Sequence, residues 1–194
     1  MGKQIDYYLT PTSPWTYLGH DRFAAIAKRH GAAVAVKPVD YGVIFPQSGG
    51  LPLAKRAPQR QAYRLSELAR WRDHLGVSLN VHPKFFPADP TQAACLICAA
   101  PAEKRMAIAG DFLRAVWAGE KNIADAGVLA EVAASHGVAD VANAVARGKA
   151  LYESNTREAV ERQVFGAPTY VYRDELFWGQ DRLEFLDRAL AARG

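Results

Sequence analysis

The chain has 194 residues, of which 49% are hydrophobic and 23% are charged, and its formal net charge at pH 7 is +4. This composition is typical of a globular protein with a sizeable core and excludes a disordered or fibrous chain. No apolar run approaches the ~20 residues of a membrane span, and no signal peptide is apparent, so we expect a cytoplasmic protein. The basic residues alternate with acidic ones, which argues against nucleic-acid binding and favours a small anionic ligand.

The N-terminal part of the chain predicts a strand–helix–strand unit. Residues 5–9 form an apolar run typical of a strand, and apolar side chains recur at helical spacing in residues 15–30, before Gly31. Residues 33–39 predict a second strand, which completes a βαβ unit. Residues 41–53 are rich in glycine and proline, and we expect a long loop there, of a kind that is often functional.

The middle of the chain is expected to be helical, and strands return only near the C-terminus. Strands at 168–172 and 175–178 form a hairpin, and a closing helix follows at 180–193. Gly148 is expected to separate the last two helices of the middle region. The helices predicted there are 59–75, 90–101, 103–118, 125–136, 138–145 and 152–163.

This order of elements is that of a thioredoxin-like fold interrupted in its middle. We therefore predict an α/β protein in which a large all-helical insertion separates a βαβ half from a ββα half. The thioredoxin-like domain would be discontinuous, comprising residues 1–57 and 164–194, and the insertion would comprise residues 58–163.

The first predicted helix opens with Ser13-Pro14-Trp15-Thr16, directly after the first strand and a short loop. Thioredoxin-like proteins present their redox-active Cys-X-X-Cys motif at this place, and hydroxyl groups replace both thiols here. Ser before Pro is a preferred N-cap and N1 pair, which needs no functional explanation. The same hydroxyl, at the positive end of the helix dipole, could instead donate a hydrogen bond to a thiolate. Such a thiolate would arrive with a ligand, for which glutathione is the obvious candidate.

Two further positions are candidates for binding that ligand. Pro168 is either a cis proline, which would leave the backbone of Ala167 free to pair with a peptide-like ligand, or an ordinary proline at the start of an edge strand. Gln180 and Asp181 open the last helix. Asp181 either complements the helix dipole or binds the α-ammonium of a γ-glutamyl group, whose carboxylate would accept hydrogen bonds from the helix N–H groups.

Candidates for binding a substrate are the basic and aromatic side chains in or beside the predicted loops. Arg60, Lys55 and Lys84 could each bind a substrate carboxylate or remain solvated at the surface. His82 is either a proton shuttle or a loop residue with no catalytic part. The aromatic residues that form either a wall of the site or part of the core are Trp15, Tyr17, Phe85 and Phe86.

The only two cysteines, Cys95 and Cys98, have the spacing of a redox motif but lie in an Ala/Leu/Ile-rich helical stretch with no preceding strand. Residues three apart share one face of a helix, and free cysteine is among the most buried residue types. We interpret the pair as core packing rather than as a redox or metal site, because no second pair of ligands exists and no metal is expected.

Together these motifs resemble the 2-hydroxychromene-2-carboxylate isomerase family, a DsbA-like branch of thioredoxin folds related to kappa-class glutathione transferases. The resemblance rests on residues 7–18, 82–87, 164–170 and 175–183, so that it runs nearly end to end. One departure lies in the first predicted loop, where relatives often carry Gly-Asn before prolines. Here the sequence is Ser48-Gly49-Gly50-Leu51-Pro52, without an asparagine.

The resemblance implies glutathione as the cofactor and a specific set of site residues. Ser13 would contact the sulfur of glutathione and act in catalysis, with Trp15 beside the cofactor. Ala167 and Pro168 would bind the glutathione backbone, and Gln180 and Asp181 the γ-glutamyl end. The reaction implied is the ring opening and cis–trans isomerisation of a 2-hydroxychromene-2-carboxylate-type aromatic acid through a transient glutathione adduct, in aromatic-compound degradation.

Other functions remain open on the sequence alone. A kappa-like glutathione transferase or peroxidase would use the same thiolate site on another electrophile, and a non-catalytic glutathione-binding module would keep the fold without the chemistry. A disulfide oxidoreductase is disfavoured because Ser13 and Thr16 cannot form a disulfide. The expected partner is a small aromatic carboxylate rather than a nucleic acid or a membrane. A homodimer is compatible with the sequence, which does not decide the oligomeric state.

Overall fold

The computed structural model describes residues 2–192 and contains a four-stranded mixed sheet in the order β2–β1–β3–β4. The central strand β1 (Gln4–Leu9) pairs in parallel with β2 (Ala33–Pro38) and antiparallel with β3 (Thr169–Tyr172). The edge strand β4 (Glu175–Trp178) pairs antiparallel with β3. The βαβ and ββα halves therefore meet along one strand pair, β1 with β3, as the predicted thioredoxin-like fold requires.

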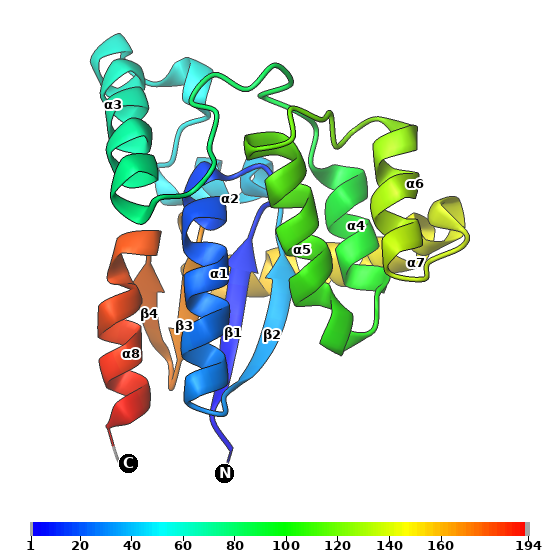
Figure 1. Cartoon of the computed structure of the whole chain (residues 1–194). Helices are drawn as coiled ribbons and strands as arrows, with labels where there is room; N and C mark the ends of the chain where they lie inside the picture. Colours follow the sequence, from blue (N-terminus) through cyan, green and yellow to red (C-terminus); the bar gives the residue numbers. More distant parts are fainter. Residues whose placement is uncertain (1, 193–194) are drawn as a thin grey trace.

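Helices cover both faces of the sheet, with α1 and α8 in front and α7 behind in the view of Figure 1. Between β2 and β3, the described elements are all helical. None of the helices in the described part of the chain is both long and apolar enough to cross a membrane. The helices are α1 (Pro14–Arg29), α2 (Tyr41–Ser48), α3 (Pro58–Leu75), α4 (Thr91–Ala99), α5 (Ala102–Trp117), α6 (Ala126–Ser135), α7 (Val141–Glu161) and α8 (Leu183–Ala191), with 3-10 turns η1 (Leu53–Lys55) and η2 (Gln180–Arg182).

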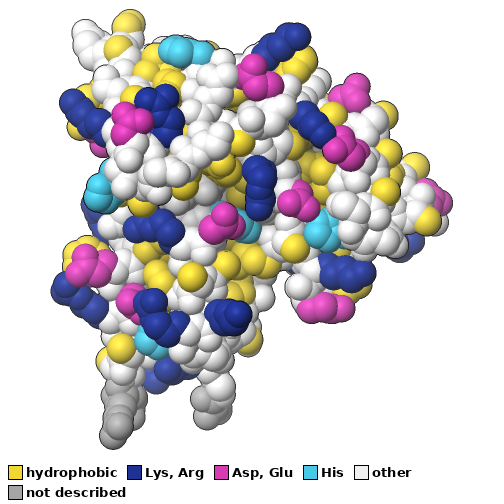
Figure 2. Space-filling model, viewed as in Figure 1, with side chains coloured by type: hydrophobic (Ala, Val, Ile, Leu, Met, Phe, Trp, Pro, Cys, Tyr) yellow, Lys and Arg dark blue, Asp and Glu magenta, His cyan; other side chains and the backbone are white. Residues whose placement is uncertain are grey.

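The alternation of side chains along β1 divides the core between the two faces of the sheet. Tyr7 lies on the α1 face, where its ring stacks on Tyr170 at 5.2 Å between centroids and contacts Phe23 of α1. Tyr8 points to the other face, where it packs with residues of α2 and α7. Charged groups of both signs are interspersed over the outer surface in Figure 2, without a large area of one sign on the face shown.

The segment predicted as a long loop, residues 41–53, contains a helix instead. Asp40 caps α2 by accepting a 2.7 Å hydrogen bond from Gly42 N, and the helix ends at Gly49 in the left-handed conformation. Ile44 is buried and contributes to the core on the α7 face of the sheet. The glycine and proline content misled the prediction because the capping residue and the buried face of this short helix outweigh its poor helix propensity.

Residues 141–161 form one continuous helix rather than two helices separated at Gly148. An ideal Cβ built on Gly148 would lie 1.9 Å from the backbone oxygen of Cys95, so α4 and α7 cross in close contact at this point. The glycine is therefore needed for the approach of two backbones and does not end a helix. At the C-terminus, the predicted helix 180–193 begins with η2 and continues as α8, and its last residue lies outside the described part.

We predict that Gly148→Ala destabilises the protein by about 2 kcal/mol or more, because the added methyl group would overlap the backbone of α4. Helix propensity alone predicts the opposite, since alanine replacing a helical glycine normally stabilises by about 0.5–1 kcal/mol. Chemical denaturation measures the difference. Ala150→Gly, at an exposed position of the same helix, is the matched control for the propensity effect. A stabilised Gly148→Ala protein would contradict the close crossing.

Candidate functional site

Ser13 is the N-cap of α1 and lies at the C-terminal end of the central strand. Its Oγ accepts a 3.2 Å hydrogen bond from Thr16 N, so the capping interpretation is confirmed. The cap uses an oxygen lone pair, and the hydroxyl proton remains free to be donated to a ligand. No acidic residue lies in the first turn of α1. The positive end of this 16-residue helix is therefore not neutralised by its own side chains.

Thr16, the second hydroxyl of the motif, plays a different part from Ser13. Its side chain is fully buried beneath the first turn of α1, and its Oγ1 has no hydrogen-bond partner in the described structure. A ligand outside the helix would meet Ser13 first. The two hydroxyls are thus not equivalent replacements for a pair of thiols. Trp15 is half-buried and packs against the main core.

The bond between Ala167 and Pro168 is cis, as the sequence analysis expected. The sheet register pairs Tyr8 with Thr169, which puts Pro168 level with the end of β1 and so at the same end of the sheet as Ser13. The loop is held by Gly179 N, which donates to Pro168 O at 2.9 Å. The backbone N–H and C=O of Ala167 have no hydrogen-bond partner within residues 2–192.

Gln180 is buried and fastens η2 to α1. Its Oε1 accepts a 2.6 Å hydrogen bond from Arg22 Nη1. A Cβ atom built on Gly19 of α1 would lie only 2.9 Å from the Cβ of Gln180, so the two elements are in close contact. The amide oxygen is thus engaged within the protein, and only the NH₂ group is left for a ligand. Asp181 is exposed, and its carboxylate pairs with Arg182.

The basic residues predicted on the substrate side lie at the surface. Arg60 is exposed on α3, and Lys84 is exposed in the loop that follows, with its Nζ 5.1 Å from the ring centre of Phe85. His82 is exposed in the same loop, where its backbone N–H donates to Asn80 Oδ1 at 3.0 Å. None of the three is held in a fixed geometry by a buried contact of its charged group.

The sequence analysis missed Arg64, which lies one helical turn after Arg60 on α3 and is only 9% exposed. Its guanidinium carbon lies 5.2 Å from the ring centre of Phe86 and 5.7 Å from that of Trp117. A signal was present in the sequence: residues 41–66 contain four basic residues and no acidic one. Spacing alone could not show that the last arginine of this run turns inward.

Cys95 and Cys98 are buried on α4 and are not bonded to each other, so their interpretation as core residues is confirmed. They pack against Ala94 and Tyr152 of the α4–α7 crossing. Burial raises the pKa of the Cys98 thiol to about 12 and also raises that of Cys95. Neither forms a reactive thiolate near neutral pH. Among the described residues, no group of three side chains could hold a metal ion.

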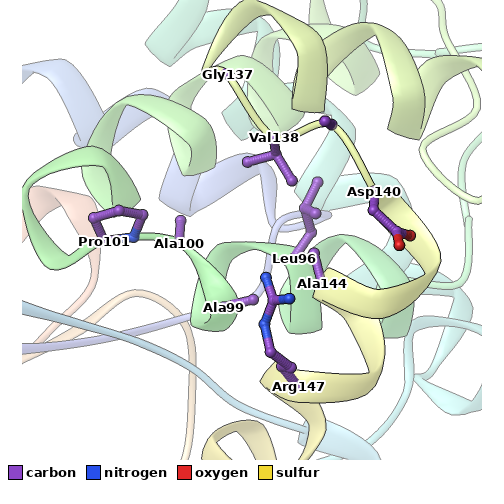
Figure 3. Close-up of a pocket in the computed structure, with 10 residues that line it drawn as sticks. Leu96, Ala99, Ala100, Pro101, Gly137, Val138, Asp140, Ala144 and Arg147 are labelled. Carbon is purple, nitrogen blue, oxygen red and sulfur yellow. The ribbon is translucent and has the colours of Figure 1, made fainter.

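A cavity of about 310 Å³ lies among the helices, away from these site residues. Figure 3 shows that Leu96 and Val138 form apolar parts of its wall, while Asp140 and Arg147 stand at its polar side. None of the residues predicted for the functional site lines it. The candidate site is therefore the end of the sheet where Ser13 and the Ala167–Pro168 loop meet, rather than this cavity.

Comparison with known proteins identifies the family to which the chain belongs. A family model described as a DSBA-like thioredoxin domain matches residues 4–191. A protein of Sphingobium xenophagum named 2-hydroxychromene-2-carboxylate isomerase is 27% identical, with 98% of this chain and 99% of the relative covered. A protein of the same name from Pseudomonas putida is also 27% identical, with 96% and 93% covered. A solved structure of 2-hydroxychromene-2-carboxylate isomerase has a TM-score of 0.83 at 24% identity, covering 97% of this chain and 94% of that one. The predicted resemblance is confirmed.

We predict that both thiols resist labelling by a thiol-specific reagent in the native protein and that both react once it is unfolded. The reason is that burial keeps Cys95 and Cys98 away from the reagent and in the protonated form. Absorbance of the released thiolate, followed with and without denaturant, measures the effect. Rapid labelling of the native protein at neutral pH would reopen the redox interpretation.

Proposed function

The chain belongs to the DSBA-like thioredoxin domain family, and on this premise we propose that it is a glutathione-dependent isomerase of 2-hydroxychromene-2-carboxylate-type aromatic acids, acting in aromatic-compound degradation. Relatives that bear the isomerase name match nearly the whole chain. The observation that carries the proposal is the serine hydroxyl at the mouth of α1, with its proton free and no acidic residue in the first turn.

The residues around Ser13 fit a peptide-like thiol such as glutathione. Ala167 offers an unpaired N–H and an unpaired C=O on one residue, which is the pattern that an extended peptide backbone pairs with. The NH₂ group of Gln180 and the exposed Asp181 lie beyond it, at the start of the last helix. Asp181 would pair with the ammonium group of the γ-glutamyl end once it leaves Arg182.

Glutathione bound at this place would supply a nucleophilic thiolate that the reaction regenerates. The part of Ser13 is to donate its hydroxyl proton in a hydrogen bond to the anionic sulfur. The part of α1 is electrostatic, because its first-turn N–H groups and dipole favour a negative charge at this place. Both effects lower the free energy of the thiolate relative to the thiol.

A second candidate is a glutathione transferase that acts on another electrophile. It is favoured by the loop Ser48-Gly49-Gly50-Leu51-Pro52, which lacks the asparagine that relatives often carry. Incubation with glutathione and either 2-hydroxychromene-2-carboxylate or a chloroaromatic acceptor separates the two. Conversion of the chloroaromatic acceptor alone would favour transfer, and glutathione binding without turnover of either would favour a non-catalytic module.

We predict that Ser13→Ala lowers kcat/KM for 2-hydroxychromene-2-carboxylate roughly ten- to a hundredfold, since a hydrogen bond to a charged group contributes about 1.5–3 kcal/mol. The variant also loses a helix cap, which costs about 1 kcal/mol of stability. Asp125→Ala is the matched control, because Asp125 caps the remote helix α6 through bonds to Gly127 N and Val128 N. Unchanged turnover in folded Ser13→Ala would remove Ser13 from the mechanism.

We also predict a low pKa for the thiol of bound glutathione. A free thiol has a pKa of about 8.5, and helix N-termini lower such values by one unit or more. Turnover should therefore be near its plateau at neutral pH. Ultraviolet difference absorbance of the complex follows thiolate formation, and the apparent pKa should rise towards the free value in Ser13→Ala. A titration of the native complex at the free-thiol value would show that the helix mouth is only a cap.

A further inference from the structure

Arg64 is a buried cation without a counter-ion. Only 9% of the residue is exposed, and its guanidinium makes no hydrogen bond or ion pair within residues 2–192. The completely buried polar atoms that lack partners belong to Asp6, Thr16, Tyr170 and Tyr172, and none belongs to Arg64. The guanidinium nitrogens therefore keep a narrow contact with solvent, through which a ligand could reach them.

The charges around Arg64 make its position more costly. From residue 41 to residue 66 the chain carries Lys55, Arg56, Arg60 and Arg64 and no acidic residue. Burial and the charge of Arg56 lower the pKa of Arg64 to about 10, and burial and the charge of Arg60 lower the pKa of Arg56. A buried charge without a counter-ion is unfavourable, and an anion bound beside it would offset that cost.

A short chain of contacts links Arg64 to the candidate site. Its guanidinium lies over the ring of Trp117. The Nε1 of Trp117 donates a 3.3 Å hydrogen bond to the backbone oxygen of Thr12, and Thr12 is the residue before Ser13. Trp117 also packs on Phe86, with ring centres 4.9 Å apart. In Figure 1, α3 and the loop that follows it lie at the same end of the sheet as the start of α1. The arginine and the start of α1 are thus linked through the side chain of Trp117.

We propose that Arg64 binds the carboxylate of a planar aromatic acid next to the Ser13 helix mouth. The guanidinium is a rigid fork that matches a carboxylate in a bidentate geometry. Trp117 is fully buried, whereas Phe86 is only half-buried and its ring centre lies 5.2 Å from the guanidinium carbon, so that partly accessible apolar ring surface adjoins the charge. The aromatic nature of the ligand rests on the proposed function, whereas the anion site rests on the surroundings of Arg64.

The test is a direct binding measurement with 2-naphthoate as the probe, in the absence of glutathione. The native protein should bind 2-naphthoate and bind the neutral isostere 2-naphthamide much more weakly. Arg64→Gln should weaken 2-naphthoate binding roughly ten- to a hundredfold and leave 2-naphthamide binding unchanged, as expected for the loss of a charged hydrogen-bond pair. Arg64→Lys, which keeps the charge but not the fork, should lie in between.

Arg70→Gln is the control, because Arg70 is an exposed residue of the same helix that pairs with Glu67. Circular dichroism checks that each variant is folded. If Arg64→Gln does not fold, the 2-naphthoate affinity of Arg64→Lys tests the proposal in its place. Absence of saturable 2-naphthoate binding to the native protein, equal binding of the acid and the amide, or undiminished 2-naphthoate binding by the folded variants would overturn the proposal.

A separate titration with glutathione distinguishes the source of the carboxylate. Glutathione affinity should be unchanged in Arg64→Gln, and a loss of glutathione affinity with intact 2-naphthoate binding would assign the arginine to glutathione instead and overturn the proposal. Because the naphthoate measurement needs neither glutathione nor turnover, a failure of the proposed isomerase activity would leave its result standing.

Discussion

Pairing of β1 with strands on both of its sides fixes where the candidate site lies. This strand pairs on both sides, with β2 in parallel and with β3 antiparallel, and Ile5, Tyr7, Tyr8 and Leu9 are fully buried. Because the chain leaves β1 at Leu9 and enters α1 at Pro14, the helix mouth must lie at that end of the sheet. The antiparallel register with β3 brings the Ala167–Pro168 loop to the same end. A one-residue slip would turn the tyrosines to the wrong face and move the loop away.

The electrostatic character of this region depends on the absence of acidic side chains as well as on the presence of basic ones. The first turn of α1 has no acidic residue, and the chain between residues 41 and 66 has none either. The helix dipole and the arginines of the α3 region therefore act in the same direction. For stability alone, an apolar side chain at this position or a carboxylate beside the guanidinium would cost less than the unpaired buried charge of Arg64. The uncompensated charge makes sense where a ligand supplies the anion.

The helices between β2 and β3 contribute to the site through their packing. Trp117, at the end of α5, is fully buried and connects the loop before Ser13 to Arg64 and Phe86. The close crossing of α4 and α7 at Gly148 anchors this layer to the sheet, with α4 and α7 both in contact with β2. Through Trp117, the position of Arg64 on α3 is tied to the residue that precedes the cap of α1.

Reading the residues in order was enough to predict the thioredoxin-like order of elements, the cap at Ser13, the cis form of Pro168 and the burial of the two cysteines. These features depend on local periodicity, on capping preferences and on short motifs, which neighbouring residues specify. The folded structure was needed to show that residues 41–48 form a helix, that α7 runs unbroken through Gly148 and that Gln180 Oε1 accepts a hydrogen bond from Arg22. It also decided that Arg64, rather than its exposed neighbour Arg60, turns onto Trp117. The α4–α7 crossing, the Gln180–Arg22 hydrogen bond and the Arg64–Trp117 contact each join segments far apart in the chain, and no local pattern encodes which partner a side chain will meet.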